Sequence, residues 1–510
     1  VQTTVGEARR RVATHSVRIT AFHPSGVSQM GTAAAARYST RKPRRRTGPG
    51  VGRLPNSPRL WPNLGGPEWK SPAARETQTA GPHTILFTPA SNVLFHVGRS
   101  VMVAREMARR GHRTVLAGTE RYLRDPEVAS TAESRYASLP DFSAEEGMEL
   151  LRSIWRRPNR RFIEVMIEAE IELIRRLQPD LVVVDFRPTM NVSAQACGVP
   201  IASLLLDHWM PEYATRPGWV PRTYAPGALA VRLLGEWPTG SLANPIFRGV
   251  IRYKTAPFRA AARARGQAAP RLLWELIQGD VNLLTDVEAL SRVCLPPGFH
   301  RVGPIVWEPS KPAPAWVGEL DRNRPVLLVN FGSTGHPDLF RATFAELADR
   351  PYQVMLATCG QIDVSDFEVP SNFFVERFLP VAQMMGIADL VIYHGGAGTF
   401  QQLIRAGVPG VVIATHWDQE YAGVESRARG LGPDLTMREV LSSPGRLCEA
   451  VDGLIADLPT YRERARGVRE QLDPYDGAKA AAEHLEAFLG GRLGAPAVRS
   501  PLPPPSEASH

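Results

Sequence analysis

The sequence predicts an α/β protein built from two doubly wound, Rossmann-like domains. Two observations predict this fold class. Short apolar runs that suit buried strands alternate with amphipathic helical patterns, first over residues 83–301 and again over residues 323–475. A Pro- and Lys-containing stretch, residues 302–322, separates the two series and is the expected linker.

The two ends of the chain differ in composition from these series. Residues 1–80 contain 14 Lys or Arg against 3 Asp or Glu, a local net charge of 14 − 3 = +11. The formal net charge of the whole chain is +9, so the remaining residues are slightly acidic. We expect residues 1–82 to be a disordered basic extension and the Pro-rich residues 490–510 to be a disordered tail. Because the basic residues gather outside the predicted domains, we expect no nucleic-acid partner.

Other features of the composition exclude several classes of protein. The chain has 43% apolar and 22% charged residues, and no apolar run approaches 18 residues. We therefore expect no stable membrane insertion and a cytoplasmic protein, and residues 1–30 lack the apolar run of a secretory signal. The four cysteines lie far apart without CxxC spacing, so neither a disulfide framework nor a zinc site is predicted.

The first series places two polar residues at one edge of its sheet. A strand over residues 85–88, a helix over residues 97–110 and a strand over residues 115–117 form the first crossover, and His96 ends the loop after the first strand. A buried strand over residues 181–184 leads to Asp185. Because ligands bind beyond the carboxyl ends of parallel strands, we expect His96 and Asp185 at the same edge. Residues 207–265 are irregular and rich in aromatic residues, which suits an acceptor pocket.

The most informative stretch lies in the second series, between residues 389 and 421. A buried strand over residues 390–393 is followed by the glycine-rich turn HGGAGT, a helix over residues 400–406, the sequence GVP, a second strand over residues 411–414, and a loop with His416, Asp418 and Gln419. A helix entered through glycines presents free backbone N–H groups, which suit a phosphate. A second glycine turn follows the strand over residues 326–330.

This order of motifs resembles the nucleotide-sugar site of the inverting glycosyltransferases of family 1, which include plant UDP-glycosyltransferases and actinobacterial antibiotic glycosyltransferases. In the first series, His96 precedes the His112 of the RGH turn by the family's spacing of 16 residues. The resemblance covers about residues 83–489 and implies the two-domain GT-B fold. It further implies that residues 83–301 bind the acceptor, that residues 323–475 bind the nucleotide sugar, and that the helix over residues 476–489 packs back on the first domain.

The resemblance also implies roles for individual residues. The catalytic pair would be His96 and Asp185. The donor diphosphate would be bound by Gly332, Ser333, His394, Gly395, Gly396, Ala397, Gly398 and Thr399. The base and ribose would be contacted by Phe378, Leu379, Pro380 and Gln402. The donor sugar would be bound by Asp418 and Gln419.

Three positions depart from the family pattern. Phe95 stands where the family has a glycine, Val381 replaces a glutamine, and Gln402 replaces the glutamate that binds the ribose. A glutamine still forms hydrogen bonds with a ribose, but it lacks the charge that strengthens them. The identity of the nucleotide, UDP or dTDP, stays open.

The chemistry of glycosyl transfer fits these residues. An acceptor hydroxyl needs a base, and a neutral histidine held by a carboxylate supplies one, as in a hydrolytic triad. The leaving diphosphate needs a charge sink, which the glycine loop and His394 would supply from hydrogen bonds and dipoles. Since no carboxylate cluster has metal-ligand spacing, we expect no metal and no cofactor beyond the nucleotide sugar.

Three functions remain open at this stage. The first is an inverting, metal-independent transferase that moves a sugar from a nucleoside-diphosphate sugar to a small, hydroxylated, apolar acceptor such as a natural product. The alternatives are a degenerate, non-catalytic nucleotide-sugar binder, which the three departures favour, and a GT-B nucleotide-sugar epimerase. We expect a monomer or a weak dimer.

Overall fold

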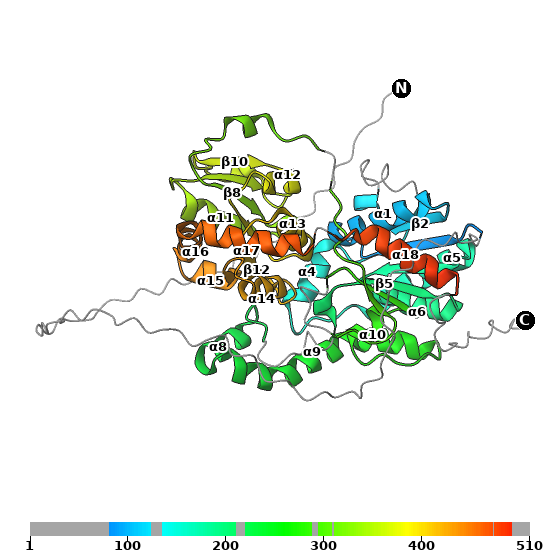
Figure 1. The fold of residues 1–510 in the computed structure, drawn as a ribbon. Helices are drawn as coiled ribbons and strands as arrows, with labels where there is room; N and C mark the ends of the chain where they lie inside the picture. Colours follow the sequence, from blue (N-terminus) through cyan, green and yellow to red (C-terminus); the bar gives the residue numbers. More distant parts are fainter. Residues whose placement is uncertain are drawn as a thin grey trace, which may run out of the picture. The chain divides into compact units, whose positions relative to one another are not determined.

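The computed structural model describes residues 81–123, 135–210, 220–287, 294–308, 311–472 and 474–491. Nearly all of the predicted extension, residues 1–82, and of the predicted tail, residues 490–510, lies outside these ranges. The described residues belong to one compact unit that begins at Gln78. Figure 1 shows its helices and strands in the order of the chain.

The first half of this unit contains a parallel sheet of seven strands in the order β3-β2-β1-β4-β5-β6-β7. The strands are β1 (Thr84–Pro89), β2 (Arg113–Gly118), β3 (Arg135–Ser138), β4 (Leu181–Asp185), β5 (Ile201–Leu205), β6 (Val281–Leu284) and β7 (Phe299–Arg301). The strand order reverses between β1 and β4, where Pro89 pairs with Asp185. This switch point is the place where doubly wound sheets bind ligands.

Helices cover both faces of this sheet. They are α1 (Leu94–Arg109), α2 (Glu120–Leu123), α4 (Ala144–Arg152), α5 (Arg160–Leu177), α6 (Pro188–Cys197), the short 3-10 helix η1 (Asp207–Trp209), α8 (Ala225–Leu234), α9 (Glu236–Ala264) and α10 (Leu273–Ile277). On one face, α1 packs its apolar stripe on β1 and β4 with Val101 and Met107 fully buried. On the other face, α5 and α6 bury Leu173 and Met190 against β4.

The second half contains a parallel sheet of six strands in the order β10-β9-β8-β11-β12-β13. The strands are β8 (Val326–Asn330), β9 (Gln353–Ala357), β10 (Phe373–Glu376), β11 (Leu390–Tyr393), β12 (Gly410–Ala414) and β13 (Asp434–Thr436). Here the order reverses between β8 and β11, where Asn330 pairs with Tyr393. Both sheets are therefore doubly wound, which confirms the predicted fold class.

The helices of the second half are α11 (Pro337–Leu347), α12 (Val381–Met385), α13 (Ala397–Ala406), α14 (Glu420–Ala428), α15 (Met437–Ser442), α16 (Arg446–Ala456) and α17 (Leu458–Glu470). Short 3-10 helices are η3 (Ala315–Glu319), η4 (Gly332–Thr334) and η5 (Val364–Asp366). The last helix, α18 (Gly477–Leu489), leaves this half and packs on α1 of the first, where Ala481 and Leu485 join the core around Met107. At the same contact Arg110 donates to Glu486 over 2.7 Å.

Two local predictions are wrong. Helix α1 begins at Leu94, so His96 lies in its first turn and not in the preceding loop. Residues 207–265 are not irregular, because α8 and α9 fill much of the stretch, and α9 runs through Pro245 and Pro257. Each proline removes one helical hydrogen bond, but the inner face of the helix buries apolar residues such as Phe247, and this packing outweighs the loss.

Among the described residues, no helix is long and apolar enough to cross a membrane. The four cysteines form no disulfide with one another, and Cys448 is buried while Cys294 is exposed.

Candidate active site

A histidine and an aspartate meet at the switch point of the first sheet. Asp185 is the last residue of β4 and is fully buried, and His96 comes from the first turn of α1. The His96 Nδ1 lies 2.7 Å from the Asp185 Oδ1. With Nδ1 occupied by the carboxylate, Nε2 is the nitrogen that remains to take a proton from a substrate.

A buried arginine completes this pair. Arg99 lies one helical turn after His96 on α1 and is only 1% exposed. Its Nε and Nη2 donate to the two carboxylate oxygens of Asp185 over 2.9 and 2.6 Å, and its Nη1 donates to the Thr285 hydroxyl over 2.8 Å. Asp185 is therefore held by a bidentate guanidinium as well as by the imidazole. We did not predict Arg99, although its spacing of three residues from His96 was a usable signal.

Aromatic rings surround the His96 imidazole. The rings of Phe95, Phe186 and Trp209 each lie 5.6 Å from it, centroid to centroid. Phe186 follows Asp185 directly and adopts a φ of 53°, an unusual conformation for a bulky residue. The lining gives the imidazole an apolar, aromatic neighbourhood, which suits an apolar acceptor.

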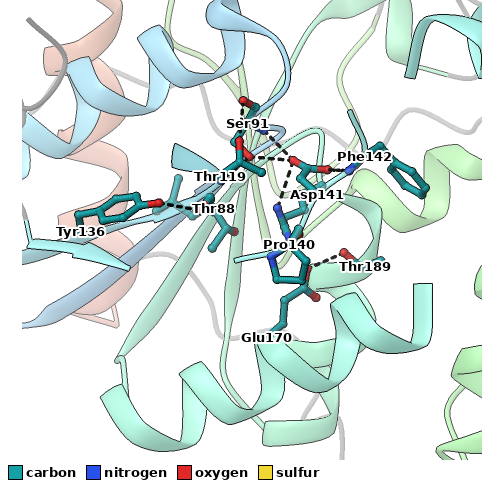
Figure 2. A network of polar contacts seen from close by, with 12 residues as sticks. Thr88, Ser91, Thr119, Tyr136, Pro140, Asp141, Phe142, Glu170 and Thr189 are labelled. Atoms are coloured by element: carbon teal, nitrogen blue, oxygen red, sulfur yellow. Dashed lines mark hydrogen bonds and ion pairs between the residues drawn. The ribbon is translucent and has the colours of Figure 1, made fainter. Parts of the chain in front are cut away.

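A second polar network fixes the loops beside this pair (Figure 2). Asp141 accepts hydrogen bonds from the backbone N and the hydroxyl of Ser91 over 2.8 and 3.0 Å, and Ser91 belongs to the connection between β1 and α1. Arg187, two residues after Asp185, contacts Asp141 and donates to Glu170 over 2.6 Å. Glu170 also accepts from Thr189 over 2.6 Å. These buried charges fix the segment before α1 and the segment after β4, which adjoin the two members of the pair.

The two glycine turns of the second half make room for one histidine. Gly332, in the turn after β8, has a φ of 59°, and a Cβ there would lie 2.8 Å from the His394 ring. A Cβ on Gly396 would lie 2.4 Å from the same ring. Gly395 has a φ of 82° and approaches the Gln419 carbonyl, where a side chain would clash. The glycines are therefore needed to pack both turns around His394.

The helix after this turn begins with N–H groups that have no hydrogen-bond partner among the residues that the structure describes. Helix α13 begins at Ala397, and its cap residue, Gly396, supplies no side-chain hydrogen bond to the first turn. The N–H groups of Ala397, Gly398 and Thr399 open this helix, and Ser333 lies in the facing turn. Such a helix start attracts anions through its N–H groups and its dipole.

The imidazole of His394 is neutral at physiological pH. Burial lowers its pKa to about 4, although a contact of 3.4 Å with the Asn330 carbonyl acts in the opposite direction. Burial likewise lowers the pKa of His416 to about 4, and the His416 Nδ1 has no hydrogen-bond partner among the described residues. Neutral imidazoles here donate hydrogen bonds without adding charge.

The predicted donor-sugar residues lie against the first half of the chain. The Asp418 Oδ1 lies 3.2 Å from the indole Nε1 of Trp209 and 3.3 Å from the Nε2 of His208. Burial alone would raise the pKa of Asp418, but His208, His416 and the hydrogen bond from Trp209 outweigh it and lower the pKa to about 2. Asp418 is thus a carboxylate. Since Trp209 also touches His96, the two predicted groups share a neighbour.

The side chain of Gln419 holds its own turn. Its Oε1 accepts from the backbone N and the hydroxyl of Thr415 over 2.8 and 2.9 Å. The residue is 3% exposed, so its carboxamide lies beneath the surface of the site.

The predicted base platform lies on the connection between β10 and α12. Phe378 is 53% exposed, and the cations of Arg377 and Lys311 lie 5.4 and 5.3 Å from its ring. Leu379 and Pro380 behind it are buried. An exposed ring beside two cations suits a nucleobase with its attached phosphates. Gln402, on α13, is partly buried.

Direct contacts join the halves of the site. Gln401 of α13 donates to the Thr285 carbonyl over 2.9 Å, and Thr285 is the residue whose hydroxyl receives Arg99. A Cβ on Gly398 would lie 2.6 Å from the Phe95 ring. A cavity of about 60 Å³ lies where these parts meet, between Asp207 and His208 on one side and residues of α13 and α14 on the other. The structure therefore brings the His96–Asp185 pair, the start of α13 and Asp418 to one place, whereas no contact described here joins Phe378 to the first half.

Sequence comparison relates the chain to glycosyltransferases. Residues 342–485 match the family described as the C-terminal domain of erythromycin biosynthesis protein CIII-like proteins. A PGL/p-HBAD biosynthesis glycosyltransferase of Mycobacterium tuberculosis is 30% identical over 337 residues, which is 65% of this chain and 75% of the relative. The NDP-glycosyltransferase YjiC of Bacillus subtilis is 24% identical over 77% of this chain and 94% of its own length.

Solved structures share the fold. The calicheamicin glycosyltransferase CalG4 superposes with a TM-score of 0.56 at 22% identity, over 80% of this chain and 98% of its own. The glycosyltransferase VinC in complex with dTDP superposes with a TM-score of 0.56 at 19% identity, over 80% of this chain and all of its own. At these identities the likeness concerns the fold, which is GT-B.

Proposed function

The chain belongs to the glycosyltransferase family that includes the mycobacterial enzymes of PGL/p-HBAD biosynthesis and the antibiotic glycosyltransferases, and on this premise we propose how it works. It transfers a sugar, with inversion, from a nucleoside-diphosphate sugar to a hydroxyl group of a small apolar acceptor. The observation that carries this proposal is the contact of 2.7 Å between His96 and Asp185 at the sheet edge, beside the start of α13.

The acceptor hydroxyl is deprotonated by His96. As its oxygen attacks the anomeric carbon, the Nε2 of His96 takes the hydroxyl proton, the bond between the anomeric carbon and the diphosphate breaks, and the nucleoside diphosphate leaves with that electron pair. Asp185 keeps the proton of Nδ1 in place and stabilises the imidazolium that forms. A single displacement of this kind inverts the anomeric configuration.

The leaving diphosphate is received by the second half of the chain. The N–H groups at the start of α13, the turn with Ser333 and the neutral His394 face the negative charge that develops. These groups suffice as a charge sink without a metal ion, and the proposed reaction uses no cofactor. The carboxylate of Asp418 and the turn of Gln419 bind hydroxyl groups of the donor sugar, where a charge-assisted hydrogen bond has its greatest effect.

The nucleotide part of the donor is a pyrimidine nucleoside diphosphate, either UDP or dTDP. Two glycosyltransferases that share the fold, VinC and the spinosyn rhamnosyltransferase SpnG, were solved with thymidine diphosphate. Phe378 with its flanking cations suits the base, and Gln402, on α13, would bind the ribose.

Product analysis tests this proposal. The protein is incubated with UDP- and dTDP-sugars and a panel of phenolic and polyketide acceptors, and products are detected by mass spectrometry. We expect a mass increase of one sugar on an acceptor and an anomeric configuration, read by NMR coupling constants, opposite to that of the donor. Binding of the donor without any transfer would support a non-catalytic binder, and conversion of the donor to an epimer without an acceptor would support an epimerase.

A further inference from the structure

Large apolar side chains are exposed together on one part of the described structure. Among the described residues, ten large apolar side chains are well exposed, and six of these come from α8, α9 and the connection between α4 and α5. They are Trp155 (79% exposed), Leu229 (58%), Leu233 (71%), Leu234 (57%), Ile246 (70%) and Tyr253 (43%), and we name them the α8–α9 surface. Gathered exposed apolar groups of this kind mark interaction sites.

Printed contacts join part of this surface. Helices α8 and α9 follow each other directly at Gly235 and contact each other (Figure 1, green). The Tyr253 hydroxyl donates to the carbonyl of Trp155 over 3.2 Å, and the guanidinium of Arg157 lies 5.4 Å from the Tyr253 ring. The opposite face of α9 buries Phe247, Ile251 and Phe258. Helix α9 is therefore amphipathic, and its outer apolar groups are not part of the core.

The charge of this region is mainly positive. Residues 222–274 contain nine Lys or Arg and a single acidic residue, Glu236. Seven arginines of α8, α9, the connection between α4 and α5 and the start of α5 are exposed, namely Arg156, Arg157, Arg160, Arg161, Arg232, Arg248 and Arg252. Of these, Arg156 pairs with Glu149. On α9, the helical periodicity puts Arg248 and Arg252 on one exposed side and Ile246 and Tyr253 on another. Apolar groups next to a cluster of arginines match the pattern of helices that lie in the interface of a bilayer.

We propose that the α8–α9 surface docks on the surface of a bilayer that contains anionic lipids. The leucines, Ile246 and Trp155 enter the boundary between head groups and acyl chains, while the arginines contact lipid phosphates. A second copy of the chain is a poorer occupant, because two such surfaces would bring like charges together. The docking does not depend on the proposed sugar transfer.

Docking there would place the bilayer next to the candidate active site. Phe247, on the inner face of α9, lies 5.3 Å from Trp417, ring to ring, and Trp417 adjoins Asp418. An apolar acceptor dissolved in the bilayer would then have a short path to the site. This consequence, unlike the docking itself, rests on the proposed function.

The test is sedimentation of the full chain with vesicles of phosphatidylcholine and of phosphatidylcholine mixed with phosphatidylglycerol. The probe variant is Leu229→Ser/Leu233→Ser/Leu234→Ser, and the matched control is Val165→Ser/Leu441→Ser, which changes two exposed apolar residues elsewhere. We expect the wild type and the control to bind the anionic vesicles within about twofold of each other. The triple variant should bind them at least roughly tenfold more weakly.

A second variant tests the charge. In Arg248→Gln/Arg252→Gln, binding to anionic vesicles should fall by roughly fivefold for each arginine and become less sensitive to salt. The basic residues 1–80 are present in every variant, so a contribution from them cancels in the comparison. If the triple variant binds like the control, or if it only converts a dimer into a monomer in light scattering, the proposal is overturned. Circular dichroism and thermal unfolding establish that each variant is folded.

Discussion

Replacing Arg99 with methionine should separate its role at the candidate active site from a general role in the core. Arg99 is 1% exposed and donates two hydrogen bonds to Asp185, which is 0% exposed, and one to Thr285. Removing one partner of a buried ion pair costs about 3 to 5 kcal/mol of folding free energy. We expect the lower end, about 3 kcal/mol, because His96 still pairs with the carboxylate.

Replacing Arg99 should also change the pH dependence of kcat/KM in a direction that a loss of core packing does not predict. Without the guanidinium, the charge of Asp185 acts on the imidazole of His96 alone and stabilises the imidazolium. The acidic limb of the kcat/KM profile should therefore move to higher pH. A less firmly held Asp185 should also lower kcat by roughly 10- to 100-fold. Arg99→Lys, which keeps a charge but not the bidentate contact, should recover the position of the limb but not all of kcat.

Arg187→Met is the matched control for this experiment. Arg187 is also 1% exposed and pairs with Glu170 and Asp141, but it does not touch His96 or Asp185 in any contact described above. We expect a similar loss of stability in urea unfolding and an unchanged acidic limb. Identical pH profiles for the Arg99 and Arg187 variants, at matched stability, would refute the reasoning.

Three further variants test other parts of the structure. His394→Ala should weaken nucleoside diphosphate and nucleotide sugar together in calorimetry, since both carry the diphosphate, whereas equal binding to wild type would remove His394 from the site. Asp418→Ala should weaken only the nucleotide sugar, by about 1 to 3 kcal/mol. Burial raises the pKa of Glu420 from 4.5 to about 7, against hydrogen bonds from Thr223 and Arg222. Its contribution to stability is therefore complete below pH 4.5 and is lost as the pH rises to 7, by about 3 kcal/mol, a dependence that Glu420→Gln should abolish in urea unfolding at several pH values.

The sequence alone predicts those parts of the site that are formed by consecutive residues. A strand that ends at Asp185 and a glycine turn around His394 are read from a few consecutive residues, and parallel strands place their ends at one edge. The two doubly wound domains followed from the same alternation of strands and helices, and the GT-B fold followed from the family resemblance.

The parts that sequence reasoning missed depend on partners far apart in the chain. In the sequence, only its spacing of three residues from His96 distinguishes Arg99 from other charged helix residues, because its partner Asp185 lies 86 residues away. The contact between Trp209 and Asp418 spans 209 residues and joins the two halves, so no local pattern announces it. The prolines of α9 indicate an irregular segment when the sequence is read alone. The tertiary packing that keeps α9 helical outweighs their cost, but no local sequence pattern predicts it.

His96 is proposed to be the base of the sugar transfer, and one measurement tests this role most directly. The decisive measurement is the single-turnover rate of His96→Ala, with donor affinity measured by calorimetry on the same preparation. The rate should fall 10²- to 10⁴-fold, about 3 to 5 kcal/mol of barrier, while donor affinity stays within about twofold. His83→Ala, a histidine at the amino end of β1, serves as the control and should retain the wild-type rate. Transfer by His96→Ala at close to the wild-type rate, with a hydroxyl acceptor, would contradict the account.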